Sequence, residues 1–310
     1  MLISFHPCIK GGANFRLTPA HLFTAKEMQR AKSAQAVVVT QHVKFDQYTA
    51  LKQCCPAVFP NYDHRFGFEG KYGNVQLFRK FEAPHPETRL YKSVKAFKKR
   101  HLAGQEPLGG FPLILKGDRG GGGWAVFLAR NPGELKQHLQ KLENEHFHPT
   151  KRFIVQRFVS HQGADLRVVI IGNTVKTYWR CQNQSGEIRN NVGRGAVIVH
   201  EMAPELTAKG VQCVKNFCSK TGINLAAFDV LFDRNQDQPP ALLSEINFLF
   251  GRKGLGGSAA FHALLKAAVD VWLQDLPQSR PLYQTDKQGT SVSPRLKFDE
   301  PCRRHGRPRH

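Results

Sequence analysis

No stretch of this 310-residue sequence approaches the ~18–20 consecutive apolar residues that a membrane-spanning helix needs. Its first segment has no charged region ahead of an apolar stretch and no small-residue cleavage site, so we expect no signal peptide. The seven cysteines include no CxxC pair and no Cys/His spacing typical of zinc, and the adjacent Cys54 and Cys55 suit a disulfide framework poorly. These absences argue against a membrane protein and a zinc or disulfide scaffold, and they favour a globular protein of a reducing cytoplasm.

Acidic residues are also scarce: Asp and Glu number 24 against 45 Lys and Arg, which gives a formal net charge of +21. Such an excess attracts anionic partners, including nucleotides, nucleic acid and acidic peptides. Part of it lies in a polar, proline-containing segment from about Thr285, which we expect to be disordered. Its arginines could bind RNA, although a solvated tail accounts for them more simply; they are Arg303, Arg304, Arg307 and Arg309.

Apolar residues make up 41% of the chain, enough for a buried core in two or three lobes. Residues 1–85 alternate strand, helix and strand, which predicts a small α/β lobe with a parallel sheet. In it we expect a helix from Thr18-Pro19, with Leu22 and Met28 on its apolar side, and a strand over residues 36–40. A Pro-rich connector, EAPHPETR, follows near Phe81.

Residues 86–150 and 151–283 form the next two expected lobes, and 284–310 the tail. The central block has a basic helix, two strands around a glycine loop, and a helix with Asn131 as N-cap and Glu134 completing a capping box. The third block has a strand in FIVQRFV, a hairpin turning at Gly172-Asn173, two strands around residues 228–233 and 241–247, and a final helix.

The segment FDVLFDRNQDQPPALLSEIN carries the clearest chemical pattern. If its two strands pair symmetrically about Asp237, Asp229 lies opposite Glu245, and Asn247 projects from the same face as Glu245. Two carboxylates and an amide oxygen suit Mg²⁺, with phosphate oxygens and water as further ligands. The alternative is two solvated acids on a hairpin of assumed register.

The segment KGDRGGGGWAV places consecutive glycines between two strands, where backbone can approach a ligand closely or a flap can move. Such a loop can point N–H groups at phosphates, and Lys116 offers a point charge beside it. It is not a Walker A loop, because no Gly-Lys-Ser/Thr follows. A flexible hairpin tip explains the glycines equally well.

A third pattern lies between Gln156 and Gly195. Asp165 and Arg167 share one face at the start of a strand. The later segment GEIRNNVGRG concentrates hydrogen-bond donors in a loop, as a phosphate clamp would; the donors are Arg189, Asn190, Asn191 and Arg194. A solvated turn has the same composition.

Together and in this order, these segments resemble the ATP-grasp fold, closest to its RimK and glutathione-synthetase-like branch, over about residues 90–276. The resemblance implies an α/β (α+β) architecture, in which a small N-terminal α/β lobe precedes two α+β lobes that enclose the nucleotide. It implies that Asp229, Glu245 and Asn247 are magnesium ligands, with Mn²⁺ as a possible substitute.

The resemblance also implies the nucleotide contacts. Lys116 would bind the phosphates, assisted by Lys92 or Lys95, under the glycine flap of Gly120, Gly121 and Gly122. The hinge that holds adenine would be Gln156, Arg157, Phe158 and Val159, and Asp165 would bind ribose. Arg189 and Arg194, with Asn190 and Asn191, would lie near the transferred phosphate.

The activity implied is ATP-dependent carboxylate–amine ligation through an acyl phosphate, releasing ADP and phosphate, with an anionic amino acid, peptide or acidic protein tail as substrate. Two departures bear on it: Arg157 replaces a common glutamate, and FLFGRKGLGG follows the EIN segment in place of a small-Pro-Gly turn. A phosphotransferase that stops at phosphorylation, or a non-catalytic nucleic-acid-binding protein, are the alternatives. The sequence does not define the oligomeric state.

Overall fold

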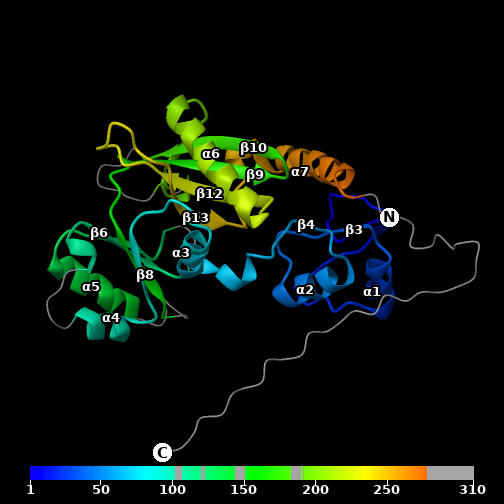
Figure 1. Ribbon diagram of the computed structural model, residues 1–310, viewed down its shortest axis with the longest axis horizontal. Coiled ribbons are helices and arrows are strands. Elements are labelled where there is room, and N and C mark those ends of the chain that lie inside the picture. The colour runs from blue at the N-terminus through cyan, green and yellow to red at the C-terminus, as the bar shows by residue number, and fades with distance from the viewer. Residues whose placement is uncertain (102–106, 120–122, 144–150, 183–189, 191, 278–310) are drawn as a thin grey trace, which may run out of the picture. The chain divides into compact units, whose positions relative to one another are not determined.

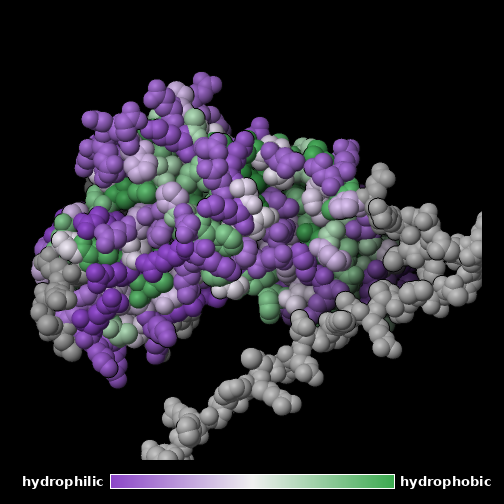
Figure 2. Space-filling view, in the orientation of Figure 1, coloured by the Kyte–Doolittle hydropathy of each residue, from purple (hydrophilic) through white to green (hydrophobic). Residues whose placement is uncertain are grey.

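The computed structural model describes residues 1–101, 107–119, 123–143, 151–182, 190 and 192–277. Residues 1–276 form one compact unit, built on three β-sheets in the described part of the chain (Figure 1). Hydrophilic side chains predominate on the face shown in Figure 2, and apolar ones appear there as separate small areas. None of the described helices is long and apolar enough to cross a membrane. The expected tail, residues 284–310, lies outside the described residues.

The N-terminal sheet has four parallel strands in the order β2-β1-β3-β4, as the alternating pattern predicted. Helices α1 and α2 supply the crossovers, and α3 follows the sheet. Short strands rich in Val, Ile and Phe are typical of a sheet buried on both faces. The bounds are β1 Leu2–Ser4, β2 Ala13–Asn14, α1 Ala25–Lys32, β3 Ala36–Val38, α2 Phe45–Cys54, β4 Val58–Phe59 and α3 Gly70–Lys80.

The prediction that the first helix starts at Thr18-Pro19 was wrong. Helix α1 begins only at Ala25, because Thr24 and Glu27 form a reciprocal capping box: Glu27 N donates to Thr24 Oγ1 (3.2 Å) and Thr24 N to Glu27 Oε2 (2.8 Å). The carbonyls of Thr18 and His21 instead accept hydrogen bonds from Gln47 Nε2, which fixes that segment as a loop. Leu22, expected on the apolar side, is 85% exposed.

The second sheet is antiparallel, in the order β5-β8-β6-β7. Helices α4 and α5 cover one face (Figure 1). There Phe97 and Leu139 pack in one apolar cluster with Leu115 and Val155. The expected lobe boundary at 150/151 falls one strand too early, since β8 pairs within this sheet. The bounds are β5 Thr88–Tyr91, α4 Val94–His101, β6 Leu113–Gly117, β7 Val126–Ala129, α5 Pro132–Glu143 and β8 Phe153–Arg157.

Helix α5 begins as its sequence predicted, with one difference. Asn131 Oδ1 accepts a hydrogen bond from Glu134 N (2.9 Å), and Leu135, Leu139 and Leu142 are buried. Glu134 Oε2, however, accepts from the backbone N–H of Arg130 (2.8 Å) rather than from that of Asn131. Both hydrogen bonds of a capping box are therefore present, but the second is donated by the residue before the N-cap instead of by the N-cap itself.

The third sheet has five antiparallel strands in the order β11-β10-β9-β12-β13. The hairpin turns at Gly172-Asn173 as predicted, with Ile171 opposite Thr174. The two-residue period of β9 and β12 sends Val168 and Phe228 beneath α6, and Val169 and Ala227 beneath α7. The bounds are β9 Ala164–Ile171, β10 Thr174–Cys181, β11 Val197–Val199, α6 Pro204–Thr221, β12 Leu225–Leu231, β13 Leu242–Asn247 and α7 Gly257–Gln274.

Helix α7 covers only one end of its face of the five-stranded sheet. The strand positions that continue this face beyond the helix carry charged side chains: Asp165 and Arg167 on β9, Arg180 on β10 and Asp229 on β12. This sheet face is thus apolar where it packs against α7 and polar beyond the helix. The polar end forms one wall of the candidate site.

Candidate functional site

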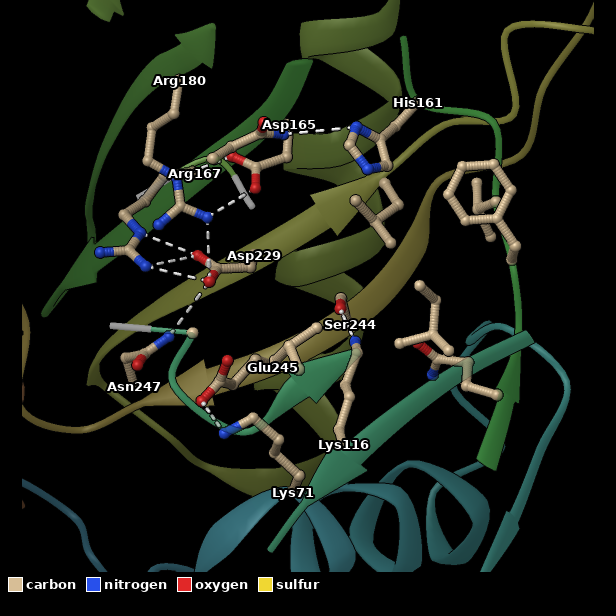
Figure 3. Close-up of a pocket in the computed structure, with 18 of the residues that line it drawn as sticks. Lys71, Lys116, His161, Asp165, Arg167, Arg180, Asp229, Ser244, Glu245 and Asn247 are labelled. Carbon is tan, nitrogen blue, oxygen red and sulfur yellow. Dashed lines mark hydrogen bonds and ion pairs between the residues drawn. The ribbon is translucent and has the colours of Figure 1, made fainter. Parts of the chain in front are cut away.

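The candidate site is a pocket between the polar end of the five-stranded sheet and the face of the second sheet that α4 and α5 leave uncovered (Figure 3). Along β6, Leu113 and Leu115 point into the core under the helices, so Ile114 and Lys116 line the pocket. The other lining residues are Lys71, Gly123, Val126, Gln156, Arg157, Phe158, Val159, His161, Asp165, Arg167, Arg180, Asn190, Asp229, Leu231, Ser244, Glu245 and Asn247.

Asp229 and Glu245 lie directly opposite each other on β12 and β13, which confirms the predicted register. Beyond this pair the register shifts, so that Val230 pairs with Leu243 and Ser244 is an extra residue, a β-bulge. Leu243 and Ile246 remain buried, whereas the consecutive Ser244 and Glu245 both line the pocket. The bulge therefore adds a hydroxyl beside the carboxylate.

Two arginines bind the buried carboxylate of Asp229. Arg167 donates from Nε to Oδ1 (2.8 Å) and from Nη2 to Oδ2 (3.0 Å), and Arg180 Nη2 lies 3.0 Å from Oδ2. Arg180 also donates to both oxygens of Asp165, each at 2.7 Å. Burial alone would raise the pKa of Asp229, but the two guanidinium groups outweigh it and hold that pKa below its usual value.

The donor set fits a hard cation in its chemistry. Asp229, Glu245 and Asn247 offer two carboxylates and an amide, and Asn247 Nδ2 lies 3.4 Å from Asp229 Oδ2, so the three side chains converge. Among the described residues no cluster of three His, Cys, Asp or Glu could hold a metal, so the amide is a necessary third donor. A metal ion here would share the Asp229 carboxylate with Arg167 and Arg180.

Two lysines approach this acidic pair from other elements. Lys116 Nζ donates to Ser244 Oγ (3.0 Å), and Lys71 Nζ, on the first turn of α3, lies 3.6 Å from Glu245 Oε1. Desolvation by the pocket walls lowers the pKa of Lys116 to about 8, with Glu245 opposing the shift. The two ammonium groups and the acidic pair therefore face each other across the pocket.

The residues predicted as a hinge line the far end of the pocket, where β8 leaves the second sheet. Gln156 is buried and donates to Thr88 Oγ1 (2.9 Å), and Phe158 and Val159 follow it. Arg157 is exposed, and its Nε contacts Glu87 Oε2 (3.1 Å). Its guanidinium also donates to the Leu108 carbonyl, so Arg157 lines the pocket edge while its charge is paired outside it.

Asp165, predicted to bind ribose, lies deeper than that role suggests. Its carboxylate is buried and engaged by Arg180, in the polar cluster beside Asp229. Asn190 is buried behind it; with its amide in the orientation that satisfies both ends, it donates to Gly163 O (3.0 Å) and accepts from Asp165 N (3.2 Å). The ribose role of Asp165 stays a prediction.

Lys92 is not brought to the site. It is exposed between β5 and α4 and is not among the lining residues. Lys95 is exposed on α4 and is likewise absent from the lining. Lys71 lies where the second phosphate-binding lysine was expected.

The remaining predicted contacts lie outside the described side chains. Gly120, Gly121, Gly122, Arg189 and Asn191 are outside the described residues, and for Arg194 the structure gives only a backbone position in the 3-10 turn Val192–Arg194. These assignments stay predictions.

The segment that leads into the glycine loop is fixed by Asp118. Its carboxylate accepts hydrogen bonds from the backbone N–H of Tyr72 (3.0 Å) and from Arg152 Nε (2.9 Å), and its carbonyl accepts from Lys71 N. A Cβ on Gly70 would lie 2.3 Å from Asp118 Oδ1, so only glycine permits this approach. The contact also sets the position of Lys71, next in the chain.

Several lining residues that make polar contacts were not predicted as site residues, among them Arg180, Arg167, Lys71 and Ser244. Arg180 could have been found, because a turn at Gly172-Asn173 places it opposite Asp165, and the observed pairing is the same. Arg167 was recognised only as a neighbour of Asp165 on one face. Neither Lys71 nor Ser244 gives a signal in sequence, since one depends on how α3 packs and the other on a bulge.

The sequence of this chain is similar to that of known ligases, and it matches one family model. The family model described as the RimK-like ATP-grasp domain matches residues 69–254, more than half of the chain. Beta-citrylglutamate synthase B of Danio rerio is 32% identical over 163 residues, which are 52% of this chain and 38% of the relative. N-acetylaspartylglutamate synthase A of Homo sapiens is 31% identical over 163 residues, or 52% and 39%.

The chain thus spans less than half the length of these two relatives. Among solved structures, N5-carboxyaminoimidazole ribonucleotide synthetase from Thermotoga maritima superposes with a TM-score of 0.54 at 12% identity. The match covers 89% of this chain and 69% of that one. At this identity the likeness concerns the fold, and it agrees with the three-lobed architecture expected from the sequence.

Proposed function

The chain belongs to the RimK-like ATP-grasp family, and from this premise we propose that it is an ADP-forming carboxylate–amine ligase. The observation that carries the proposal is the convergence of Lys116 from one sheet and of Asp229, Glu245 and Asn247 from another in a single pocket. The predicted hinge residues line the far end of the same pocket, where the nucleotide base would bind. Such a site works by positioning and charge neutralisation, without a protein nucleophile.

We assign the nucleotide contacts as follows. Lys116 and Lys71 bind the ATP phosphates, and the backbone at residues 156–159 holds adenine. Arg189 and Arg194, with the glycine segment of residues 120–122, complete the phosphate site, with Asn190 and Asn191 beside it. Asp229, Glu245 and Asn247 would hold Mg²⁺ or Mn²⁺, which when bound neutralises phosphate charge.

The proposed reaction has two steps. A carboxylate oxygen of the acid bonds to the γ-phosphorus of ATP while the bond to the β–γ bridging oxygen breaks, giving an acyl phosphate and ADP. An amine nitrogen then bonds to the acyl carbon, phosphate leaves, and the nitrogen loses a proton to solvent. Lys116 stabilises the charge that develops on the transferred group, and the closed pocket limits hydrolysis of the acyl phosphate.

The substrates follow from charge and from the relatives. Two relatives are named for the synthesis of β-citrylglutamate and N-acetylaspartylglutamate, so we propose that one substrate here is an amino acid or peptide. The net charge of +21 favours an anionic amine, such as an acidic amino acid or an acidic protein tail. The six cysteines of the described part are all free, which supports our proposal of a cytoplasmic, reducing compartment.

Nucleotide binding should raise the thermal stability of the chain. With ADP or ATP at ~100-fold above its dissociation constant and with Mg²⁺ present, we expect the melting temperature to rise by roughly 5 °C, because ligand binds only the folded state. Differential scanning fluorimetry measures this, with Mg²⁺ alone and nucleotide plus EDTA as controls. Absence of a shift with every nucleotide tested would contradict the proposed function.

The affinity for nucleotide should depend on the charge of Lys116. Its pKa is lowered to about 8 in the free protein, and bound phosphate would raise it. The attraction is therefore complete below pH 8 and weakens above it, by up to about tenfold per pH unit. Titration calorimetry with MgADP between pH 7 and 9.5 measures the slope. Lys116→Arg, whose charge persists, should flatten the slope; an unchanged slope would assign it to another group.

A further inference from the structure

A second cavity, of about 920 Å³, opens from the polar cluster on the side away from the hinge. It shares Arg167, Arg180 and Asn247 with the central pocket, so the two spaces meet at the proposed metal site. The rest of its lining is predominantly apolar. The side chains that define it are Trp124, Tyr178, Ile198, Leu249, Phe250 and Lys253.

Two of these side chains are apolar and exposed. Trp124 is 68% exposed and Leu249 48%, and they belong to the seven large apolar side chains that are exposed in the described part of the chain. Trp124 precedes β7 of the second sheet and Leu249 follows β13 of the third, so both sheets contribute to the lining. Exposed apolar side chains that line a cavity are typical of a ligand-binding site.

The wall that carries Leu249 is held in place on both sides. The Phe248 carbonyl accepts a hydrogen bond from Gln41 Nε2 (3.0 Å), and the Phe250 ring packs edge-on against Phe261, with centroids 5.7 Å apart. Gly254 lies so close to Tyr178 that a Cβ would come within 2.4 Å of its ring. Because its neighbours are anchored, Leu249 cannot withdraw into the core, and its exposure is a property of the fold.

The cavity is polar at its inner end and apolar along its body. Arg167, Arg180 and Asn247 lie where it meets the central pocket, and Lys253 is the other charged side chain in its lining. A carboxylate near the arginines would sit next to the proposed phosphate site. A second carboxylate along the apolar body would lose hydration, and its one charged partner there would be Lys253, which is exposed and keeps its own hydration.

Resting on the proposed function, we propose that this cavity selects the acid that is activated, and that this acid carries one carboxylate and an aromatic or branched apolar group. The apolar group lies between Trp124 and Leu249, and the carboxylate points to the metal site. Trp124 and Leu249 are the specificity-determining residues. A flat ring gains most from Trp124, because aromatic pairs add attraction beyond the area they bury.

The acid can be tested without knowledge of the amine. Hydroxylamine traps an acyl phosphate: its nitrogen bonds to the acyl carbon, phosphate leaves, and the hydroxamate is measured together with ADP. With MgATP, we expect kcat/KM for 3-phenylpropionate or 4-methylpentanoate to exceed that for glutarate by at least about tenfold. A preference for glutarate would overturn the inference and leave the ligase function standing. No hydroxamate from any of the three acids, in a protein whose melting temperature MgATP raises, would overturn the inference; no hydroxamate and no rise with any nucleotide would overturn the proposed function as well.

Variants separate the cavity from general effects on the enzyme. Trp124→Ala should raise the KM for 3-phenylpropionate roughly tenfold while leaving the dissociation constant of MgADP unchanged, and Trp124→Phe should restore most of the loss. Leu249→Ala should act in the same direction. Leu22→Ala, which removes an exposed leucine from the N-terminal lobe, is the matched control and should change nothing. An unchanged KM in Trp124→Ala would overturn the assignment.

Discussion

Glu245→Gln should lower ATP-dependent hydroxamate formation by roughly a thousandfold, the upper range for loss of one preorganised charge at a phosphoryl-transfer site. The substitution keeps the shape of the side chain and removes its charge. Glu245 supplies one of two carboxylates in the proposed metal site, and its partner Asp229 is already bound by two arginines. Glu245 is thus the more available anionic ligand, and the measurement is the steady-state rate with saturating MgATP.

The fold should tolerate this change. The Glu245 side chain is about one-third exposed, and its contact with Lys71 is long at 3.6 Å. We therefore expect the melting temperature without nucleotide to stay within about 2 °C of the original, as is usual for a partly exposed ion pair. The matched control is Glu143→Gln on α5, which removes the charge of a surface ion pair with Lys98 on α4. Loss of activity in proportion to loss of stability would argue against a role in the reaction.

Arg180→Met should lower the free energy of unfolding by about 3–5 kcal/mol, because it leaves the buried Asp165 without the arginine that binds it, whereas Asp229 keeps Arg167. Arg180 is 5% exposed and contacts both Asp165 and Asp229. Methionine retains much of the volume, so the change removes charge rather than packing. Equilibrium unfolding in urea measures the loss.

A second substitution tests the cause. Adding Asp165→Asn to Arg180→Met removes the uncompensated charge, so the double variant should recover part of the lost stability. Arg130→Met removes an exposed arginine 3.6 Å from Glu134 and should cost no more than about 1 kcal/mol. If Arg180→Met and Arg130→Met behaved alike, the buried cluster would contribute nothing beyond surface pairing.

Those parts of the site that depend on pairing within one hairpin could be predicted from the sequence. Symmetry about Asp237 predicted Asp229 opposite Glu245, which is observed, although the bulge at Ser244 shifts the pairs nearer the turn; the Gly172-Asn173 turn fixes Arg180 opposite Asp165. Both are local consequences of antiparallel geometry, in which the turn sets the register. The order of the three lobes was also predicted, because the periodicity of helices and strands is a property of the local sequence.

What could not be predicted depends on contacts between distant segments. Lys71 reaches Glu245 because Asp118, 47 positions further along the chain, fixes the start of α3. The resemblance implied Lys92 or Lys95 as the assisting lysine, but both are exposed and neither lines the pocket. Neither outcome has a periodic or compositional signal, since both follow from how helices pack on sheets.

A strand usually pairs with its neighbour and contacts other elements through the same residues. The bulge at Ser244 assigns these two roles to different residues. Without Ser244, the segment from Leu243 to Asn247 would alternate regularly between apolar and polar residues and would keep Asp229 opposite Glu245. Pairing of the strands therefore does not need this residue, and its hydroxyl instead holds Lys116 of the other sheet. For protein engineering, a substitution at Ser244 would change the hydrogen bond between the two sheets without changing the alternation of apolar and polar residues along β13.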